Sequence, residues 1–188
     1  MTIWYPVSKV PQRHFNDAFA AYNNNDCHAA AIHIRKAASY LRLESGRATT
    51  RHQLEDSLAQ LAMLATSIER DAANSDQPMT TVFAKASLAL ALEHRSKAAG
   101  FWAQQAYDKT GYALKTAADG LMNAAAWAGN EANACVLAGV ATNALGDRLA
   151  TGAAWTRNEV ELGFDMLDDV SISALFLPAI SMSFCQSY

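Results

Sequence analysis

The sequence predicts an all-α protein, an up-and-down helical bundle built from two related helical-hairpin halves. Three observations lead to this prediction. Hydrophobic residues make up 51% of the 188 residues, and much of that share is alanine, which favours helices. Apolar residues recur at helical spacing along most of the chain, and no convincing strand pattern occurs. The chain also resembles itself after a shift of 80 residues.

The self-similarity needs no gap over the stretch Ala21–Leu43. Alanine matches carry little weight, because both stretches are rich in alanine. The informative matches are aromatic, aliphatic, basic and histidine pairs: Tyr22 with Trp102, Ile34 with Leu114, Arg35 with Lys115, Leu41 with Leu121, and upstream His14 with His94. We therefore expect one domain over residues 1–188, with an internal repeat of approximately 14–73 and 94–153.

The first half divides into three predicted helices. The first covers His14–Tyr22 and ends at an asparagine cluster. Asp26 caps the second, which runs to about Glu44, because its carboxylate can accept hydrogen bonds from the free amides of the first turn. Thr49 or Thr50 can cap the third. Its apolar positions form a seam at alternating spacings of four and three: Leu54, Leu58, Leu61, Ala65 and Ile68.

The loop Asn74–Pro78 is the predicted boundary between the halves. A fourth helix starts near Thr80 or Thr81, and it is apolar nearly all round, which predicts a central position. After Tyr107 we expect a turn at Asp108–Thr110. The next helix is predicted to have a second apolar seam, which consists of Leu114, Ala118, Leu121, Ala125 and Ala128. A break follows at Gly129–Asn130, and the last two predicted helices are Val136–Leu149 and Asn158–Leu167.

The stretch Val170–Tyr188 contains no Asp, Glu, Lys or Arg. It is rich in large apolar residues, but it is too short and too interrupted by serine and Pro178 to predict a membrane span. Two interpretations remain open. This apolar tail either packs across the bundle or is an exposed segment that docks on another subunit or a partner.

Charge and cysteine content narrow the class of protein. The formal net charge is -3, and Lys and Arg are scattered, so we expect no nucleic-acid partner. Cys27, Cys135 and Cys185 have no metal-site spacing and are typical of free thiols in a reducing compartment, with a single disulfide as the open alternative. Residues Met1–Val10 lack the pattern of a signal peptide. The sequence thus predicts a cytoplasmic protein.

Histidine and glutamate residues give the one candidate for a metal or small-ligand site. If the helices bring them together, a polar site can form inside the bundle from His33, Glu44, His52, Glu55, Glu93 and His94. Di-iron bundles use two ExxH pairs, and this chain has none; His52 and Glu55 have the reverse order. The competing interpretation is that each histidine lies on a helix flank without a metal. No cofactor is assigned.

Catalytic patterns are weak. The segment Arg47–His52 resembles the R-x(4–6)-H motif of HEPN-type helical ribonucleases, and Ala103–Ala106 resembles a stretch of the same superfamily. However, Ala48 stands where a polar residue is usual, and the motif comes early in the chain. No phosphate-binding loop, GxSxG or HExxH motif occurs. No catalytic residue is assigned, and we expect the protein not to be an enzyme.

Further stretches resemble an uncharacterised bacterial group of alanine-rich, internally duplicated helical proteins of the planctomycete type: Lys36–Ser45, and Gly111–Leu121 followed by Ala124–Gly129. The resemblance extends over Asn25–Val170 and implies the fold but no activity. The chain has fewer histidine pairs than that group. The preferred hypothesis is a non-catalytic interaction or structural bundle that contacts a protein partner or a second copy of itself. The alternatives are a bundle that binds a metal or small ligand and, more remotely, a HEPN-like ribonuclease.

Overall fold

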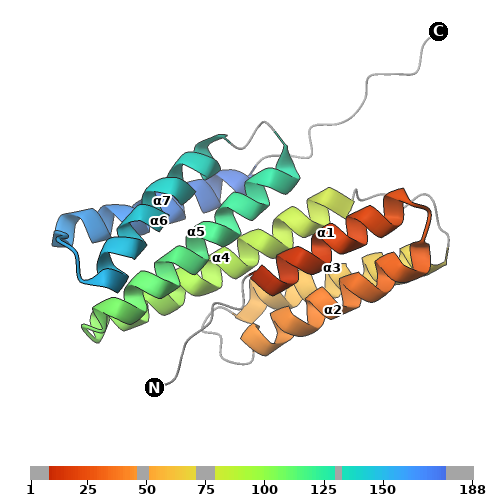
Figure 1. Cartoon of the computed structure of the whole chain (residues 1–188), viewed down its shortest axis with the longest axis horizontal. Coiled ribbons are helices and arrows are strands. Elements are labelled where there is room, and N and C mark those ends of the chain that lie inside the picture. Colours follow the sequence, from red (N-terminus) through yellow and green to blue (C-terminus); the bar gives the residue numbers. More distant parts are fainter. Residues whose placement is uncertain (1–8, 46–50, 71–78, 130–132, 177–188) are drawn as a thin grey trace, which may run out of the picture.

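The computed structural model describes residues 9–45, 51–70, 79–129 and 133–176. These residues form seven α-helices and no strand, which confirms the all-α prediction. Their bounds are α1 Lys9–Asn23, α2 Cys27–Ser45, α3 Arg51–Glu69, α4 Met79–Ala103, α5 Tyr107–Ala128, α6 Asn133–Thr151 and α7 Arg157–Phe176. Consecutive helices lie side by side and run up and down (Figure 1). No helix among the described residues is both long and apolar enough to cross a membrane.

The long helix α4 contributes to the core at both ends of the molecule. Helices α1, α2 and α3 lie beside its N-terminal half (Figure 1). Helix α5 runs along most of its length, because Trp127 near the end of α5 contacts Phe83 near the start of α4. Helix α6 packs on α5, and α7 lies beside the C-terminal half of α4. The buried core follows the same division, because one set of core residues spans Phe15–Leu90 and the other spans Leu88–Leu167. The two sets meet inside α4. The predicted boundary at Asn74–Pro78 lies outside the described residues, and the core divides further along the chain.

Two helix-ending turns have matching geometry 80 residues apart. Asn25 and Gln105 both have φ of 59°. The amide of Asp26 donates to the carbonyl of Ala21 at 2.9 Å, and the amide of Ala106 donates to the carbonyl of Phe101 at 2.9 Å. Both are Schellman turns, in which a left-handed residue satisfies the last carbonyls of a helix. This match supports the 80-residue repeat, although a duplication in the chain's history stays a prediction.

The second of these turns corrects one expectation. The turn lies at Gln104–Ala106, and Asp108–Thr110 belongs to the first turns of α5. The prediction was wrong because polar residues also suit the start of a helix. The carboxylate of Asp108 favours the positive end of the helix dipole. The hydroxyl of Thr110, which is fully buried, donates to the carbonyl of Ala106.

Most predicted core positions are confirmed. All five residues of the α3 seam are buried, as are the α5 residues Leu114, Ala118, Leu121 and Ala125. Ala128, at the end of α5, is exposed. The N-cap is also confirmed, because the Asp26 carboxylate accepts a hydrogen bond from the amide of Ala29 at 2.9 Å. Helix α6 is present as expected, but it turns valines outward: Val136 and Val140 are exposed.

Glycines explain the orientation of α6. A Cβ atom placed on Gly111 of α5 would lie 2.5 Å from the amide nitrogen of Ala150 and 2.6 Å from the carbonyl oxygen of Gly146. A Cβ on Gly146 would lie 2.8 Å from the carbonyl oxygen of Gly111. The two backbones therefore touch at these glycines. Because α6 presents its small residues to α5, its larger apolar residues at Val136 and Val140 face outward.

This contact predicts opposite effects for two alanine substitutions. Gly111→Ala should destabilise the fold by about 1–3 kcal/mol, because the added methyl group has to push two backbones apart. Gly100→Ala should stabilise it by about 0.5–1 kcal/mol, because Gly100 is also helical but has no atom within 4 Å of the added methyl group. Urea unfolding of both variants checks the contrast. Equal effects in the two variants would contradict the close α5–α6 contact.

Candidate metal centre

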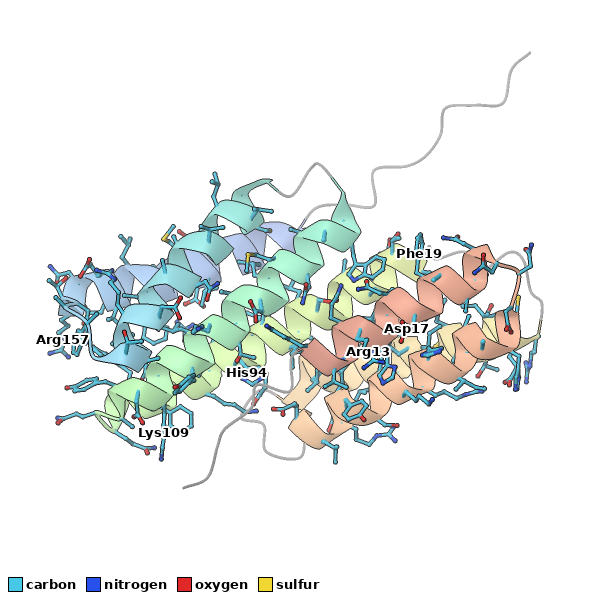
Figure 2. The ribbon with its side chains drawn as sticks, in the orientation of Figure 1. Arg13, Asp17, Phe19, His94, Lys109 and Arg157 are labelled. Carbon is cyan, nitrogen blue, oxygen red and sulfur yellow. The ribbon has the colours of Figure 1, made fainter. Side chains whose placement is uncertain are left out.

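Three potential metal ligands converge between α1 and α2. His14 and Asp17 lie three residues apart on α1, so their side chains project from the same face of that helix. His33 approaches from α2. Figure 2 shows Asp17 and its neighbour Arg13 on the side of α1 that faces α2. The three ligand side chains are half-buried, so the cluster is packed against the bundle and still reaches solvent.

The distances within this cluster fit a single small ion. The Nδ1 atoms of His14 and His33 are 3.3 Å apart, and the Asp17 carboxylate oxygen lies 3.9 Å from the first and 3.6 Å from the second. An ion in the plane of these atoms and equidistant from them would lie about 2.1 Å from each, and zinc bonds to histidine and carboxylate ligands are about 2.0–2.2 Å long. A tetrahedral ion with a fourth ligand lies outside that plane, so the Asp17 carboxylate has to approach the two nitrogens by a few tenths of an ångström.

Burial and nearby charges favour the neutral form of His14, which is the form that can bind a metal ion. Burial and the neighbouring His33, with a smaller effect of Lys36 and Arg13, lower the pKa of His14, and Asp17 opposes this shift. His14 is therefore neutral at physiological pH, which is the form that binds metal. The stacked ring of Tyr40, 5.6 Å away between centroids, fixes the orientation of the His14 ring. When one imidazole carries its proton on Nδ1, the two rings form a hydrogen bond, and a metal ion would take the place of that proton.

A second polar cluster lies where the end of α2 meets α4. Its members are Glu44, Glu93, His94 and Lys97. The Lys97 ammonium lies 2.8 Å from a Glu44 carboxylate oxygen and 3.6 Å from a Glu93 carboxylate oxygen. The His94 Nε2 atom lies 3.7 Å from the Glu44 carboxylate. The ammonium group already occupies the cation position between the two carboxylates, which makes this cluster unsuited to a metal ion.

Burial dominates the protonation of His94. Its side chain is 1% exposed, and neither ring nitrogen has a hydrogen-bond partner among the described residues. Desolvation and the Lys97 charge lower the pKa of His94 to about 4, although the Glu44 carboxylate acts in the opposite direction. The imidazole is therefore neutral at pH 7. Figure 2 shows His94 on α4, well apart from Asp17 on α1.

The six predicted candidates do not converge on one point. His33 joins His14 and Asp17, whereas Glu44, Glu93 and His94 join Lys97. Glu55 is exposed on α3. His52 belongs to the first turn of α3, but its side chain, like the loop with Arg47 that completes the HEPN-type pattern, lies outside the described residues. His14 and Asp17 were both missing from the predicted ligands, although their three-residue spacing was a readable signal.

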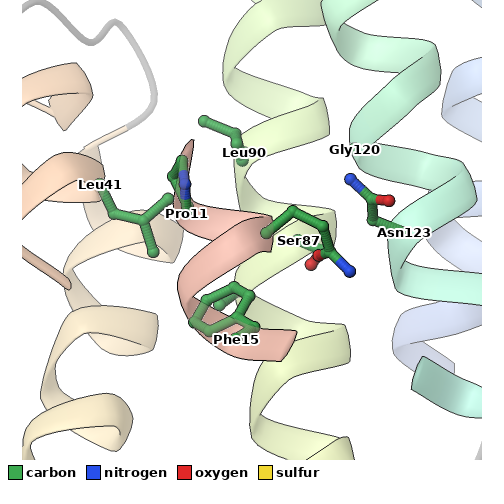
Figure 3. Close-up of a pocket in the computed structure, with 9 residues that line it drawn as sticks. Pro11, Phe15, Leu41, Ser87, Leu90, Gly120 and Asn123 are labelled. Carbon is green, nitrogen blue, oxygen red and sulfur yellow. The ribbon is translucent and has the colours of Figure 1, made fainter. Parts of the chain in front are cut away.

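The hollow in Figure 3 is a weaker candidate. It lies between α1, α2, α4 and α5, and its lining is Pro11, Gln12, Phe15, Leu41, Ala86, Ser87, Leu90, Gly120 and Asn123. This lining carries no charged group. The side-chain carbonyl of Gln12 already accepts a hydrogen bond from the Trp127 indole at 3.2 Å. Such a surface offers little to fix a ligand, so the His14, Asp17 and His33 cluster remains the best candidate site.

Comparison with known proteins adds no assignment. The chain matches no protein-family model, and no curated protein or solved structure is significantly similar to it. Membership in the alanine-rich bacterial group therefore stays a prediction.

Proposed function

We propose that this protein is a metal-binding helical bundle that holds one divalent transition-metal ion of the zinc type at His14, Asp17 and His33. The observation that carries this proposal is the triangle of ligand atoms, whose sides of 3.3, 3.6 and 3.9 Å suit one ion. Two imidazoles and one carboxylate are ligands that zinc accepts. Solvent reaches the cluster, so water can supply a fourth ligand.

The positive charge of Arg13 beside the cluster lowers the affinity that we expect for a divalent ion. Asp17 is the one acid within the cluster, and Arg13 lies 4.0 Å from its carboxylate. A bound divalent ion and Arg13 compete for that carboxylate. Since Arg13 is on the surface, its side chain can turn away into solvent at little cost. We therefore expect binding at a preformed site with a modest electrostatic penalty.

Calorimetric titration with Zn²⁺ tests the proposal. The unmodified protein should bind one ion per chain. Loss of a residue that merely supports a ligand already costs 10–100-fold in metal affinity, so His33→Ala and Asp17→Asn should each weaken binding by roughly 100-fold or more. The matched control is His28→Ala, because His28 is on α2 as well but is exposed and lies beside Glu69. It should bind zinc normally.

Two outcomes would refute the metal proposal. One is the absence of stoichiometric binding by the unmodified protein. The other is equal loss in His28→Ala and His33→Ala, which would indicate nonspecific coordination by surface histidines. His94→Gln provides a second control, since the cluster around Lys97 should contribute nothing to zinc affinity.

A second candidate is the interaction or structural role favoured by composition. One observation supports it: α6 exposes an apolar face, in which Leu137 is 71% exposed. An uncovered apolar face commonly marks a contact with another surface. This role is compatible with metal binding, because the metal cluster lies between α1 and α2 and the exposed face lies on α6.

A further inference from the structure

The outer face of α6 is apolar and carries no charge over about two and a half turns. We call this face the α6 strip; it consists of Val136, Leu137, Val140, Ala141 and Ala144, all exposed. The exposed fractions of the three large residues are 42%, 71% and 55%. Burying such side chains is favourable by about 25 cal/mol for each Å² of apolar surface removed from water. The strip is therefore a surface that favours being covered.

Helix α7 ends close to one end of this strip, so the residues that follow α7 in the sequence begin there. The ion pair between Arg148 of α6 and Glu159 of α7, at 2.9 Å, places the start of α7 beside the end of α6. Gly163 lies against Leu145. Since the two helices run in opposite directions at about 1.5 Å per residue, the end of α7 at Phe176 lies level with the start of α6. Residue 177 thus follows from the end of the strip at which Val136 lies.

The sequence that follows matches the strip in character and length. Residues 177–188 contain no charged side chain, and Pro178 opposes continuation of the helix. Ile180, Met182 and Phe184 stand at alternate positions with serines between them, a pattern that gives an extended segment one apolar face. Ile180 to Phe184 spans about 13 Å when extended, and Val136 to Ala144 spans about 12 Å along a helix.

We propose that residues 177–188 lie along the α6 strip as an extended segment and that Ile180, Met182 and Phe184 cover its exposed apolar residues. The segment runs from the start of α6 towards its end. Phe184 then comes close to Ala144, whereas Cys185 points away from the strip. This intramolecular contact is independent of the metal proposal, which concerns α1 and α2. A partner can bind the strip only by displacing this segment.

Disulfide trapping tests the contact in the full chain. In a Cys27→Ala, Cys135→Ala, Cys185→Ala background, Phe184→Cys places one thiol on the apolar face of the segment, and Ala144→Cys places a second one on the strip. The control is Ala62→Cys, on the exposed side of α3. Under mild oxidation, peptide mapping should find the intrachain bond with Ala144→Cys forming at least tenfold faster than with the control. Equal rates would overturn the proposal.

A second comparison separates this contact from other occupants of the strip. Leu137→Glu should slow the intrachain cross-link severalfold, because it places a charge in the apolar contact. Met63→Glu is the matched control, since Met63 is 73% exposed on α3 and Leu137 is 71% exposed on α6. A bond that forms mainly between chains, at a rate rising with protein concentration, would instead show a second copy on the strip and overturn the proposal.

Discussion

Replacing Lys97 by methionine is expected to destabilise the fold by about 3–5 kcal/mol, because a buried carboxylate loses its cation. Lys97 and Glu44 are each only 13% exposed, and their charged atoms are 2.8 Å apart. Methionine keeps most of the side-chain volume and removes the charge. Urea unfolding of the variant measures the loss.

Two companion variants isolate the charge effect of Lys97. Lys115→Met removes an exposed ion pair with Asp147 and should cost less than about 1 kcal/mol. Adding Glu44→Gln to Lys97→Met should recover part of the stability, because the unpaired carboxylate is removed as well. If the double variant is as unstable as the sum of both single changes, Lys97 does not stabilise Glu44 by its charge.

Acid is expected to weaken the fold through His94. The pKa of His94 is lowered from 6.5 to about 4 in the folded chain, so below pH 6.5 the unfolded chain binds a proton that the folded chain refuses. Stability is therefore lost as pH falls from 6.5 towards 4. At 1.36 kcal/mol per pKa unit, this shift accounts for a loss of about 3 kcal/mol.

Unfolding of the unmodified protein and of His94→Gln at a series of pH values checks this effect. The other titrating groups contribute to both proteins, so the difference between the two curves reports His94. The variant should keep its stability better than the unmodified protein below pH 6.5. Parallel curves would contradict a buried, neutral His94.

The two clusters occupy related positions in the chain. A shift of 80 residues pairs His14 with His94 and Asp17 with Lys97. In the first cluster the residue three positions after the histidine is the acid Asp17, which helps to form a site for a cation. In the second cluster the residue at that position is Lys97, whose ammonium group is itself the cation between the surrounding carboxylates. One exchange of charge thus separates a site that can hold an ion from one that excludes it.

Local pattern was sufficient for much of the fold. Asp26 identifies a helix start because its carboxylate can satisfy the first free amides, and the α3 seam identifies a buried face because its spacing follows the helical period. Asp108 misled because a polar residue suits both a turn and a first helical turn. The outward orientation of Val136 and Val140 on α6 was also not predictable from the sequence. It depends on the close contact between Gly111 of α5 and Gly146 of α6, which is seen only when the two helices are placed together.

The candidate site was less predictable, because it depends on which helices face each other. His33 was a candidate, but nothing local indicates that it meets His14, 19 residues earlier in the chain. Glu93 and Lys97 are four residues apart on one helix, a spacing that favours an ion pair, and this signal could have removed Glu93 from the metal candidates.

X-ray absorption spectroscopy of the zinc-loaded protein at the zinc edge tests the metal centre most directly. We expect a first shell of nitrogen and oxygen atoms at about 2.0–2.1 Å, with the outer scattering of two imidazole rings that His33→Ala reduces to one. A shell that contains sulfur, for example from Cys27 on α2, or one without imidazole scattering would contradict the assignment of His14, Asp17 and His33 as the ligands.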